Sequence, residues 1–446
     1  MKLLKFGGTS IRNAEWMNRA LDIAVAQLDS APLLVCSAMD DTTDVLLAVS
    51  RYASEGDAQE AESRIEALRQ RHFEAARKLL SEQTLTECEE RLSGLFTDLS
   101  SVMAGLFLLR ECTKRSSDLI QSFGERLATV LLSAGARERG IPCQLLDARQ
   151  FIKTSDDFSR AVPIENLTFR LIRAKVKPKA GRLLVTQGFI GSTEQGIATT
   201  LGRGGSDYSA SIFGAALKAE EIQIWTDVDG IMTADPRMVP AASTVREMTY
   251  KEAAELAYFG ARVVHPSTIQ PAVNADIPIC VRNTGNPEGQ GTRIAAGVPS
   301  EGPKAVAYKQ QVTVLNVSSG RMLMAYGFLR SIFEIFERHK TPVDLVATSE
   351  VSVSMTIDSR ESLGEILEEL ERLGTVGQEK DVAIVCLVGQ DLWKNSSIIA
   401  RVFGNLQGIP IRMISLGSSD TNLSLVVPQE STEEAVRRLH REFFEL

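Results

Sequence analysis

Short apolar runs alternate with amphipathic segments from the N-terminus to about residue 285. The runs lack polar alternation, which is typical of parallel strands that are covered on both faces. The segments between them have helical periodicity, and residues 55–115 are expected to form a helical cover. This alternation predicts an α/β fold built on a mostly parallel sheet. The expected strands are residues 3–6, 33–36, 144–147, 182–186, 221–226 and 277–281.

Polar, glycine-rich turns follow several of the predicted strands, at residues 7–10, 188–191 and 227–230. In such folds, ligands collect beyond the carboxyl ends of the strands. A further loop, 200–209, contains Arg203 and leads into a helix that Ser206 or Asp207 is expected to cap. A helix N-terminus beside an arginine favours an anion. The glycines alone are equally compatible with an ordinary turn.

The order of predicted strands and helices changes after a stretch rich in glycine and proline at residues 285–303. Strands and helices then repeat in two units of roughly 70 residues, as in paired ferredoxin-like modules. The second unit lacks a first strand, which residues 305–308 can supply, so that one module is nested in the other. The predicted domains are 1–296 and 297–446, the latter with modules at about 310–385 and at 303–309 plus 386–446.

Composition excludes several classes of protein. The 446 residues include 44% hydrophobic and 24% charged residues, and the net charge is -8. An acidic chain argues against nucleic acid or anionic membrane as a partner. The six cysteines are scattered, which indicates reduced thiols and neither a disulfide framework nor a zinc site. No signal peptide and no membrane span are recognised in the sequence, so we expect a cytoplasmic protein.

Familiar phosphate-binding motifs are absent from the chain. There is no G-x-x-x-x-G-K-[ST] motif, no G-x-G-x-x-G after the first strand, and no protein-kinase motif set. The glycine-rich turns therefore indicate binding of a nucleotide or a phosphorylated metabolite without naming a substrate.

Five segments of the chain match the motifs of a known family: KFGGTS at 5–10, TLGRGGSDYS at 200–209, WTDVDG at 225–230, FGARVVHP at 259–266 and TSEVS at 348–352. They carry a resemblance to the aspartokinases of the amino-acid kinase family. The late segments 327–329 and 343–351 are most similar to the lysine-sensitive, monofunctional type. The resemblance implies a three-layer amino-acid kinase fold in the first domain, followed by two ACT domains.

The resemblance implies ATP-dependent phosphorylation of the side-chain carboxylate of L-aspartate to 4-phospho-L-aspartate. This reaction is the first step of lysine, threonine and methionine (diaminopimelate) biosynthesis. The acceptor carboxylate is ionised at neutral pH, so no general base is needed, and positioning and positive charge carry catalysis. The implied cofactor is ATP with Mg²⁺, which phosphates and water would mostly hold. No metal ligand from the protein is expected.

The same resemblance gives roles to individual residues. Lys5 would reach the transferring phosphoryl group, and Asp207 would orient it. Arg203 would bind a carboxylate of aspartate, and Glu125 its ammonium group. As isolated residues, a lysine at a strand end or a glutamate in a long helix is usually solvated. Two hydroxyls, otherwise ordinary turn residues, complete the substrate site: Thr43 and Ser206.

The implied ATP site departs from the family at two positions. Arg262 stands where relatives commonly have lysine, which replaces a compact charge by a planar one. Met232 replaces an aromatic residue and can pack against adenine without ring stacking. The implied ATP-binding residues are Lys5, Phe6, Gly7, Gly8, Thr226, Asp227, Met232, Arg237, Arg262 and Val263.

The ACT-like modules imply feedback inhibition by L-lysine and assembly into a homodimer or a dimer of dimers. An acidic side chain is a sensible partner for an ammonium group, although each is also an ordinary loop residue. The implied lysine pocket consists of Met322, Phe328, Asp344, Ser349, Glu350 and Val351.

Two alternatives to an aspartate kinase stay open from the sequence. One is a sibling kinase acting on glutamate, acetylglutamate or carbamate, against which the paired modules and the residues 123–126 argue. The other is a catalytically weak amino-acid sensor, for which Arg262 is the single hint.

Overall fold

The computed structural model describes residues 1–260, 264–298, 302–322 and 326–445. They form two compact units. The first comprises Met1–Ile231 and Val263–Val298, and the second comprises Met232–Arg262 and Pro299–Leu446. The chain therefore passes between the units three times.

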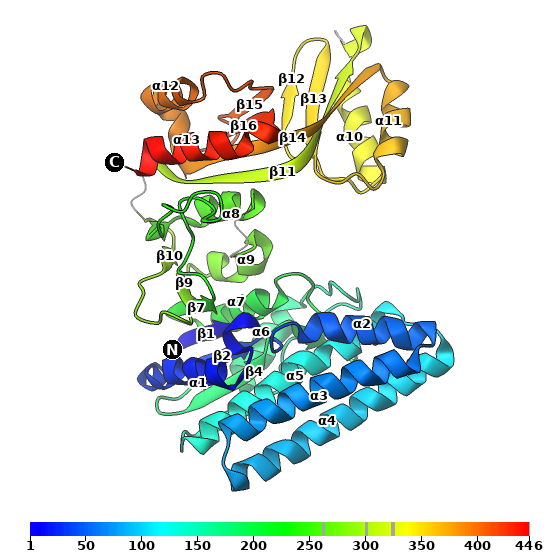
Figure 1. Cartoon of the computed structure of the whole chain (residues 1–446), viewed down its shortest axis with the longest axis vertical. Helices are drawn as coiled ribbons and strands as arrows, with labels where there is room; N and C mark the ends of the chain where they lie inside the picture. Colours follow the sequence, from blue (N-terminus) through cyan, green and yellow to red (C-terminus); the bar gives the residue numbers. More distant parts are fainter. Residues whose placement is uncertain (261–263, 299–301, 323–325, 446) are drawn as a thin grey trace. The chain divides into compact units, whose positions relative to one another are not determined.

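A mostly parallel sheet lies at the centre of the first unit (Figure 1). Its strands follow the order β3-β4-β2-β1-β7-β9-β10, and neighbouring strands are parallel except β9 and β10. The apolar runs are buried, including every residue of β2 and β4, which confirms the predicted α/β fold. The strands are β1 (Lys2–Phe6), β2 (Leu33–Cys36), β3 (Cys143–Leu146), β4 (Leu183–Gln187), β7 (Glu221–Thr226), β9 (Ile279–Asn283) and β10 (Thr292–Ile294), with a separate pair β5 (Ile190–Ser192) and β6 (Ala198–Thr200).

Helices cover both faces of this sheet. Helices α1 and α5 lie on one face and α7 and α9 on the other, while α2 to α5 lie side by side as a helical layer (Figure 1). The expected helices between residues 55 and 115 are therefore present. The helices are α1 (Ala14–Val25), α2 (Thr42–Glu55), α3 (Ala58–Leu79), α4 (Glu82–Leu109), α5 (Lys114–Glu138), α6 (Glu165–Lys175), α7 (Gly205–Leu217) and α9 (Pro266–Asn274).

Helix α4 corrects the expectation that no segment of the chain resembles a membrane span. It is long and apolar enough, by length and composition alone, to cross a membrane, and about 28% of its most apolar window is buried in the structure. Every third or fourth residue from Cys88 to Leu106 packs into the core that α4 shares with α3 and α5. Its apolar character thus serves helix packing in part.

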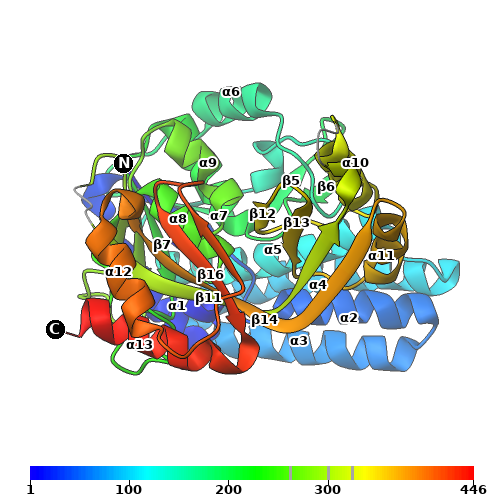
Figure 2. The same cartoon turned by 90° about the horizontal axis from the view of Figure 1, so that it is seen from above.

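One continuous antiparallel sheet runs through the second unit, in the order β12-β13-β11-β14-β16-β15. Helices α12 and α13 lie against one half of the sheet, and α10 and α11 lie against the other (Figure 2). Each half has its own apolar core. The elements are β11 (Gly302–Ser318), α10 (Phe328–Arg338), β12 (Val346–Thr348), β13 (Ser352–Ile357), α11 (Leu363–Glu371), β14 (Thr375–Gln390), α12 (Ser396–Asn405), β15 (Met413–Leu416), β16 (Asn422–Pro428) and α13 (Thr432–Phe444).

The two halves share their central strands. Residues 305–308 and 312–317, expected as separate strands, belong to the single strand β11. Its first part pairs with the end of β14 and its last part with the beginning of β14, with register shifts between Lys309 and Val314. A bulge therefore marks the place where one half of the sheet passes into the other.

The segment 232–262 is part of the second unit. Ala234 and Val239 are buried in the core formed with α12, α13 and β16. The carbonyl oxygen of Thr233 accepts a hydrogen bond from the amide of Val306 at 2.7 Å. The hydroxyl of Thr233 lies 2.9 Å from Nε2 of His440. The segment contains β8 (Glu247–Met248) and α8 (Tyr250–Tyr258).

Candidate functional site

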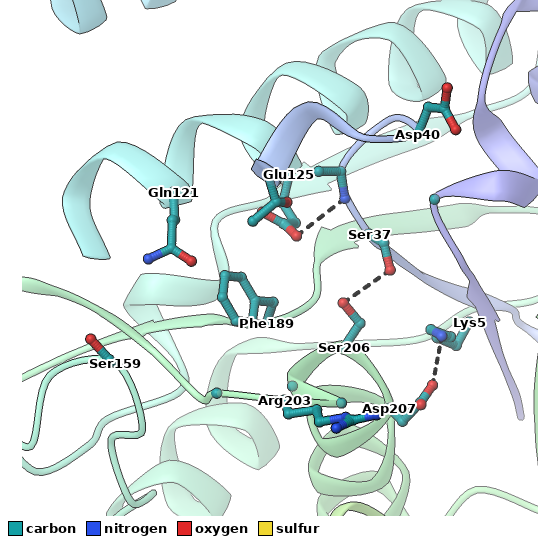
Figure 3. A pocket seen from close by; sticks show the side chains of 16 residues that line it. Lys5, Ser37, Asp40, Gln121, Glu125, Ser159, Phe189, Arg203, Ser206 and Asp207 are labelled. Atoms are coloured by element: carbon teal, nitrogen blue, oxygen red, sulfur yellow. Dashed lines mark hydrogen bonds and ion pairs between the residues drawn. The ribbon is translucent and has the colours of Figure 1, made fainter. Parts of the chain in front are cut away.

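A polar cavity of about 470 Å³ opens in the first unit (Figure 3). Residues of β1 and residues just after β2 and β4 contribute to it, so it lies at the carboxyl ends of parallel strands, where α/β folds bind ligands. Its lining residues are Lys5, Gly8, Ser37, Ala38, Asp40, Thr43, Gln121, Glu125, Ser159, Phe189, Gly202, Arg203, Gly204, Gly205, Ser206 and Asp207.

The loop 200–209 forms one wall, and its helix begins differently from the expectation. Gly204 is the N-cap of α7, with φ +70°, and no side chain caps the helix. The prediction that Ser206 or Asp207 caps α7 is therefore wrong, because glycine takes the left-handed conformation at this turn without strain. Both side chains are free to face the cavity from the first helical turn (Figure 3).

Lys5 and Asp207 form an ion pair across the cavity wall. Nζ of Lys5 lies 2.6 Å from Oδ1 of Asp207, and each side chain is 12% exposed. The attraction between opposite charges at this distance holds the ammonium group of Lys5 in place. The structure thus brings together Lys5, which the resemblance implies would reach the transferring phosphoryl group, and Asp207, which it implies would orient Lys5.

Glu125 carries a buried carboxylate on α5. The residue is 3% exposed, and Oε1 accepts the amide of Ala38 at 3.1 Å. Oε2 has no hydrogen-bond partner within the described residues. Burial raises the pKa of Glu125 to about 8, against the opposing effect of the amide of Ala38. A cation entering the cavity would stabilise the ionised form.

Three further predicted substrate residues reach the same cavity. Arg203 is exposed, and its guanidinium has no ion-pair partner in the described part of the chain. Ser206 accepts a hydrogen bond from the hydroxyl of Ser37 at 3.0 Å, which ties the start of α7 to the turn after β2. Thr43, in the first turn of α2, also lines the cavity.

The predicted ATP-binding residues of the first unit lie near the ends of β1 and β7, which are adjacent. Phe6 is fully buried and stacks on Trp225, so its side chain belongs to the core. The amide of Gly7 donates to the carbonyl of Trp225 at 3.1 Å. Thr226 donates to the exposed Asp227 at 3.1 Å, and neither lines the cavity.

The remaining predicted ATP-binding residues lie either in the second unit or outside the described residues. Met232 and Arg237 belong to the second unit. There, Met232 Sδ accepts from Thr244 at 3.6 Å, and Arg237 pairs with Asp235 at 2.6 Å. Two further predictions lie outside the described residues: Arg262 and Val263.

The predicted lysine-pocket residues occupy two places in the second unit. The side chain of Asp344 is 1% exposed and pairs with Lys309 at 2.9 Å, while Tyr258 donates a hydrogen bond to it. Residues 349–351 form the turn at the other end of β12 and are exposed. Met322 and Phe328 pack against the core beside α10. The length of β12 thus separates Asp344 from the turn.

Several cavity residues were not singled out from the sequence. Gln121 lies one helical turn before Glu125 on the same face of α5, so the i, i+4 spacing could have revealed it. Ser37 directly follows a predicted strand. Phe189 and Ser159 carried no comparable signal, since loops that are distant in sequence bring them to the cavity.

Comparisons with known proteins agree with this geometry. The family model described as the amino acid kinase family matches residues 1–283, and an ACT domain model matches residues 385–443. The chain is 38% identical to the lysine-sensitive aspartokinase 3 of Escherichia coli, covering 99% of this chain and 98% of that protein. It is 38% identical to the chloroplastic aspartokinase 2 of Arabidopsis thaliana, covering 99% and 84% respectively.

Two solved structures are similar over the whole chain. The structure of E. coli aspartokinase III in complex with aspartate and ADP has a TM-score of 0.85 and 37% identity, with 100% of both chains covered. The structure of the same protein with lysine and aspartate has a TM-score of 0.82 and 37% identity, covering 100% of this chain and 99% of the other.

Proposed function

The chain belongs to the amino acid kinase family and, within it, to the aspartokinases, and from this we propose that it phosphorylates L-aspartate. The reaction transfers the γ-phosphoryl group of ATP to the side-chain carboxylate and gives 4-phospho-L-aspartate. The product is an acyl phosphate that enters the synthesis of lysine, threonine and methionine.

The observation that carries this proposal is the arrangement of charges around one cavity. Arg203 offers a guanidinium that has no ion-pair partner among the described residues, Glu125 offers a buried carboxylate oxygen, and Lys5 offers an ammonium group held by Asp207. An α-amino acid with an acidic side chain has the complementary charges. In the proposed complex, Arg203 binds its α-carboxylate, Glu125 its ammonium group, and Thr43 and Ser206 donate further hydrogen bonds.

The chemistry asks little of the protein beyond position and charge. The nucleophile is a carboxylate that is ionised at neutral pH, so no residue has to remove a proton. The difficulty is the approach of one anion to another. Lys5 reduces this repulsion because its positive charge lies between the acceptor and the phosphates, as in other phosphoryl transfers.

Nucleotide binding is proposed at the ends of β1 and β7. Lys5, Gly7 and Gly8 would approach the phosphates, and Thr226 and Asp227 would hold the nucleoside side, with Met232, Arg237, Arg262 and Val263 as further family positions. The described residues contain no group of three or more metal-binding side chains. The proposed Mg²⁺ ion arrives with ATP and is held mostly by phosphates and water, where it would neutralise charge on the transferred group.

Regulation by L-lysine is proposed for the second unit. The proposed pocket holds the six residues assigned from the sequence, including Asp344 and Glu350. Because Asp344 already pairs with Lys309, the ammonium group of a bound lysine either displaces Lys309 or binds at the exposed Glu350. We also propose a cytoplasmic homodimer or dimer of dimers that assembles through the ACT domains.

The proposal is tested by trapping the acyl phosphate with hydroxylamine. The protein, ATP and Mg²⁺ are incubated with aspartate, glutamate, acetylglutamate or carbamate, each with and without millimolar lysine. We expect a hydroxamate from aspartate alone, and less of it when lysine is present.

Absence of aspartyl hydroxamate would exclude the proposed reaction. Lysine binding, measured by calorimetry, in a protein that forms no hydroxamate would favour the amino-acid sensor. Activity that is indifferent to lysine would remove only the regulatory part.

A further inference from the structure

Asp118 is a fully buried carboxylate that lies behind the cavity and does not line it. It occupies the second turn of α5, seven residues before Glu125. That spacing places Asp118, Gln121 and Glu125 on one face of the helix. The face that lines the cavity at Gln121 and Glu125 therefore continues to Asp118.

Among the described residues, two separate loops donate the hydrogen bonds that Asp118 accepts: the loop that contains Ser159, and the loop that follows β6 and starts at the last residue of that strand, Thr200. The amide of Ser159 lies 3.0 Å from both carboxylate oxygens. Thr200 donates its amide to Oδ2 at 2.8 Å and its hydroxyl to Oδ1 at 2.9 Å. Asp118 has no ion-pair partner among the residues that the structure describes.

These two loops form the cavity wall around Arg203. Thr200 directly precedes the turn that holds Gly202, Arg203 and Gly204, and Ser159 lines the cavity itself. The loops are also joined to each other, since the amide of Ala161 donates to the carbonyl of Thr200 at 2.9 Å. A shift of either loop would thus move the guanidinium of Arg203 relative to Glu125.

The backbone at this wall needs an external constraint. Ser159 has φ +75°, a conformation that is unfavourable for a residue with a side chain. The neighbouring loop contains three glycines at 202, 204 and 205, which leave the free chain many conformations. A buried charged acceptor that binds both loops restricts them to one arrangement.

We propose that Asp118 is a positioning residue for the acceptor amino acid: it joins the Ser159 loop to the Arg203 loop and so sets the affinity of the cavity for the α-carboxylate. The inference rests on the proposed function. It assigns Asp118 no contact with substrate. It also predicts that ATP, which is proposed to bind at the ends of β1 and β7, is largely unaffected.

The test is a kinetic comparison of two variants with one control. In Asp118→Asn the amide NH₂ group must face at least one of the loop N–H donors. The variant therefore keeps the size of the side chain and loses at least one of its hydrogen bonds to the two loops. Thr200→Val removes only the hydroxyl donor. Asp157→Asn, in the same loop, is the matched control, because Asp157 is bonded locally to Ser155.

We expect Asp118→Asn to raise KM for aspartate at least tenfold while KM for ATP and kcat change less than threefold. Thr200→Val should shift KM for aspartate in the same direction by a smaller factor, and Asp157→Asn should behave like the wild type. Thr200→Val, a milder change, keeps the test decisive if Asp118→Asn does not fold.

Three results would overturn the inference. One is an unchanged KM for aspartate in both variants. A second is an equal rise of both KM values with a fall in kcat, which would indicate a general structural role. The third is the absence of aspartyl hydroxamate with the wild-type protein, which would refute both the proposed function and this inference. If the wild type is active and both variants keep its KM for aspartate, only the inference about Asp118 is refuted.

Discussion

At the scale of single residues, the ion pair of Lys5 and Asp207 predicts a specific kinetic defect. Lys5→Ala removes the cation proposed to act on the transferring phosphoryl group, whereas Arg203 and Glu125 still bind aspartate. We expect kcat to fall by about 10²- to 10³-fold, the effect of removing one electrostatic stabiliser, with little change in the Kd for aspartate. Steady-state kinetics and equilibrium dialysis measure the two quantities.

Lys2→Ala, on the same strand and outside the cavity lining, is the control for the charge change. A turnover number that is unchanged in Lys5→Ala would exclude Lys5 from the mechanism.

Glu125 predicts a pH-dependent stability. Its pKa is about 8 in the folded protein, above its ordinary value of 4.5, so the native state binds more protons than the unfolded state between these values. Native stability is therefore lost as pH rises through this window. Glu125→Gln should be more stable than the wild type at pH 9, by on the order of a few kcal/mol, and similar to it at pH 4.5.

Urea denaturation at a series of pH values measures this difference. The control variant is Glu165→Gln, which changes an exposed carboxylate in the first turn of α6. A difference between Glu125→Gln and the wild type that does not vary with pH would contradict the assignment of the raised pKa.

Sequence reasoning singled out the cavity-lining residues that lie in a motif and missed those that the fold brings together from separate loops. Lys5, Arg203 and Asp207 lie in two glycine-rich segments, 5–10 and 200–209, that carry the family resemblance. Ser159 lines the same cavity because of a turn with positive φ, which the local sequence does not predict. The cap of α7 was misjudged because serine and aspartate are common N-caps, whereas this helix begins at a left-handed glycine.

At the scale of elements, the contact between the turn after β1 and the turn after β2 depends on a missing side chain. A Cβ atom at Gly8 would lie 2.9 Å from the carbonyl oxygen of Ala38 and 3.0 Å from that of Asp40. Both are backbone atoms and cannot rotate away. Gly8→Ala should therefore displace the second turn and lower the free energy of unfolding by about 1–3 kcal/mol.

The neighbouring glycine provides a matched control. A Cβ atom at Gly7 would meet nothing closer than 3.7 Å, so Gly7→Ala should cost less than about 1 kcal/mol. Chemical denaturation of both variants compares them. The amide of Ala38 binds Glu125, so Gly8→Ala should also raise KM for aspartate. Equal losses of stability would contradict the steric argument.

Strand positions could be predicted because the strands are buried. Runs such as Leu33–Cys36 show no polar alternation and are covered on both faces. The length of β11 could not be predicted, because Lys309–Gln311 interrupt its apolar pattern at the bulge. That polar interruption separates two apolar runs in the sequence and yet lies within one strand of the sheet.

At the scale of the whole molecule, the segment 232–262 predicts that the catalytic unit does not tolerate loss of the C-terminal region. Ala234 and Val239 are buried among residues of α12, α13 and β16. A chain ending at Val298 would expose these side chains and lose the partners of Thr233. We expect it to be less soluble and to unfold at a lower temperature than the full chain.

Sedimentation after expression and thermal denaturation measure this effect. A second truncated chain with Val239→Ser tests its cause, since removing exposed apolar surface should recover part of the solubility. A truncated chain as soluble and as stable as the full protein would contradict the prediction. Periodicity could not reveal this arrangement, because it reports which face of a segment is buried and not which distant core buries it.

The discontinuous second unit also has a consequence for protein synthesis. A growing chain presents residues 232–262 long before α13 leaves the ribosome, and their core is complete only when α13 arrives. His440, six residues from the end of the chain, lies against Thr233. The apolar residues of the segment therefore stay exposed while roughly two hundred further codons are translated. During that time chaperones can bind them. Slow translation of the codons for α12 and α13 would prolong that interval and lower the yield of folded protein.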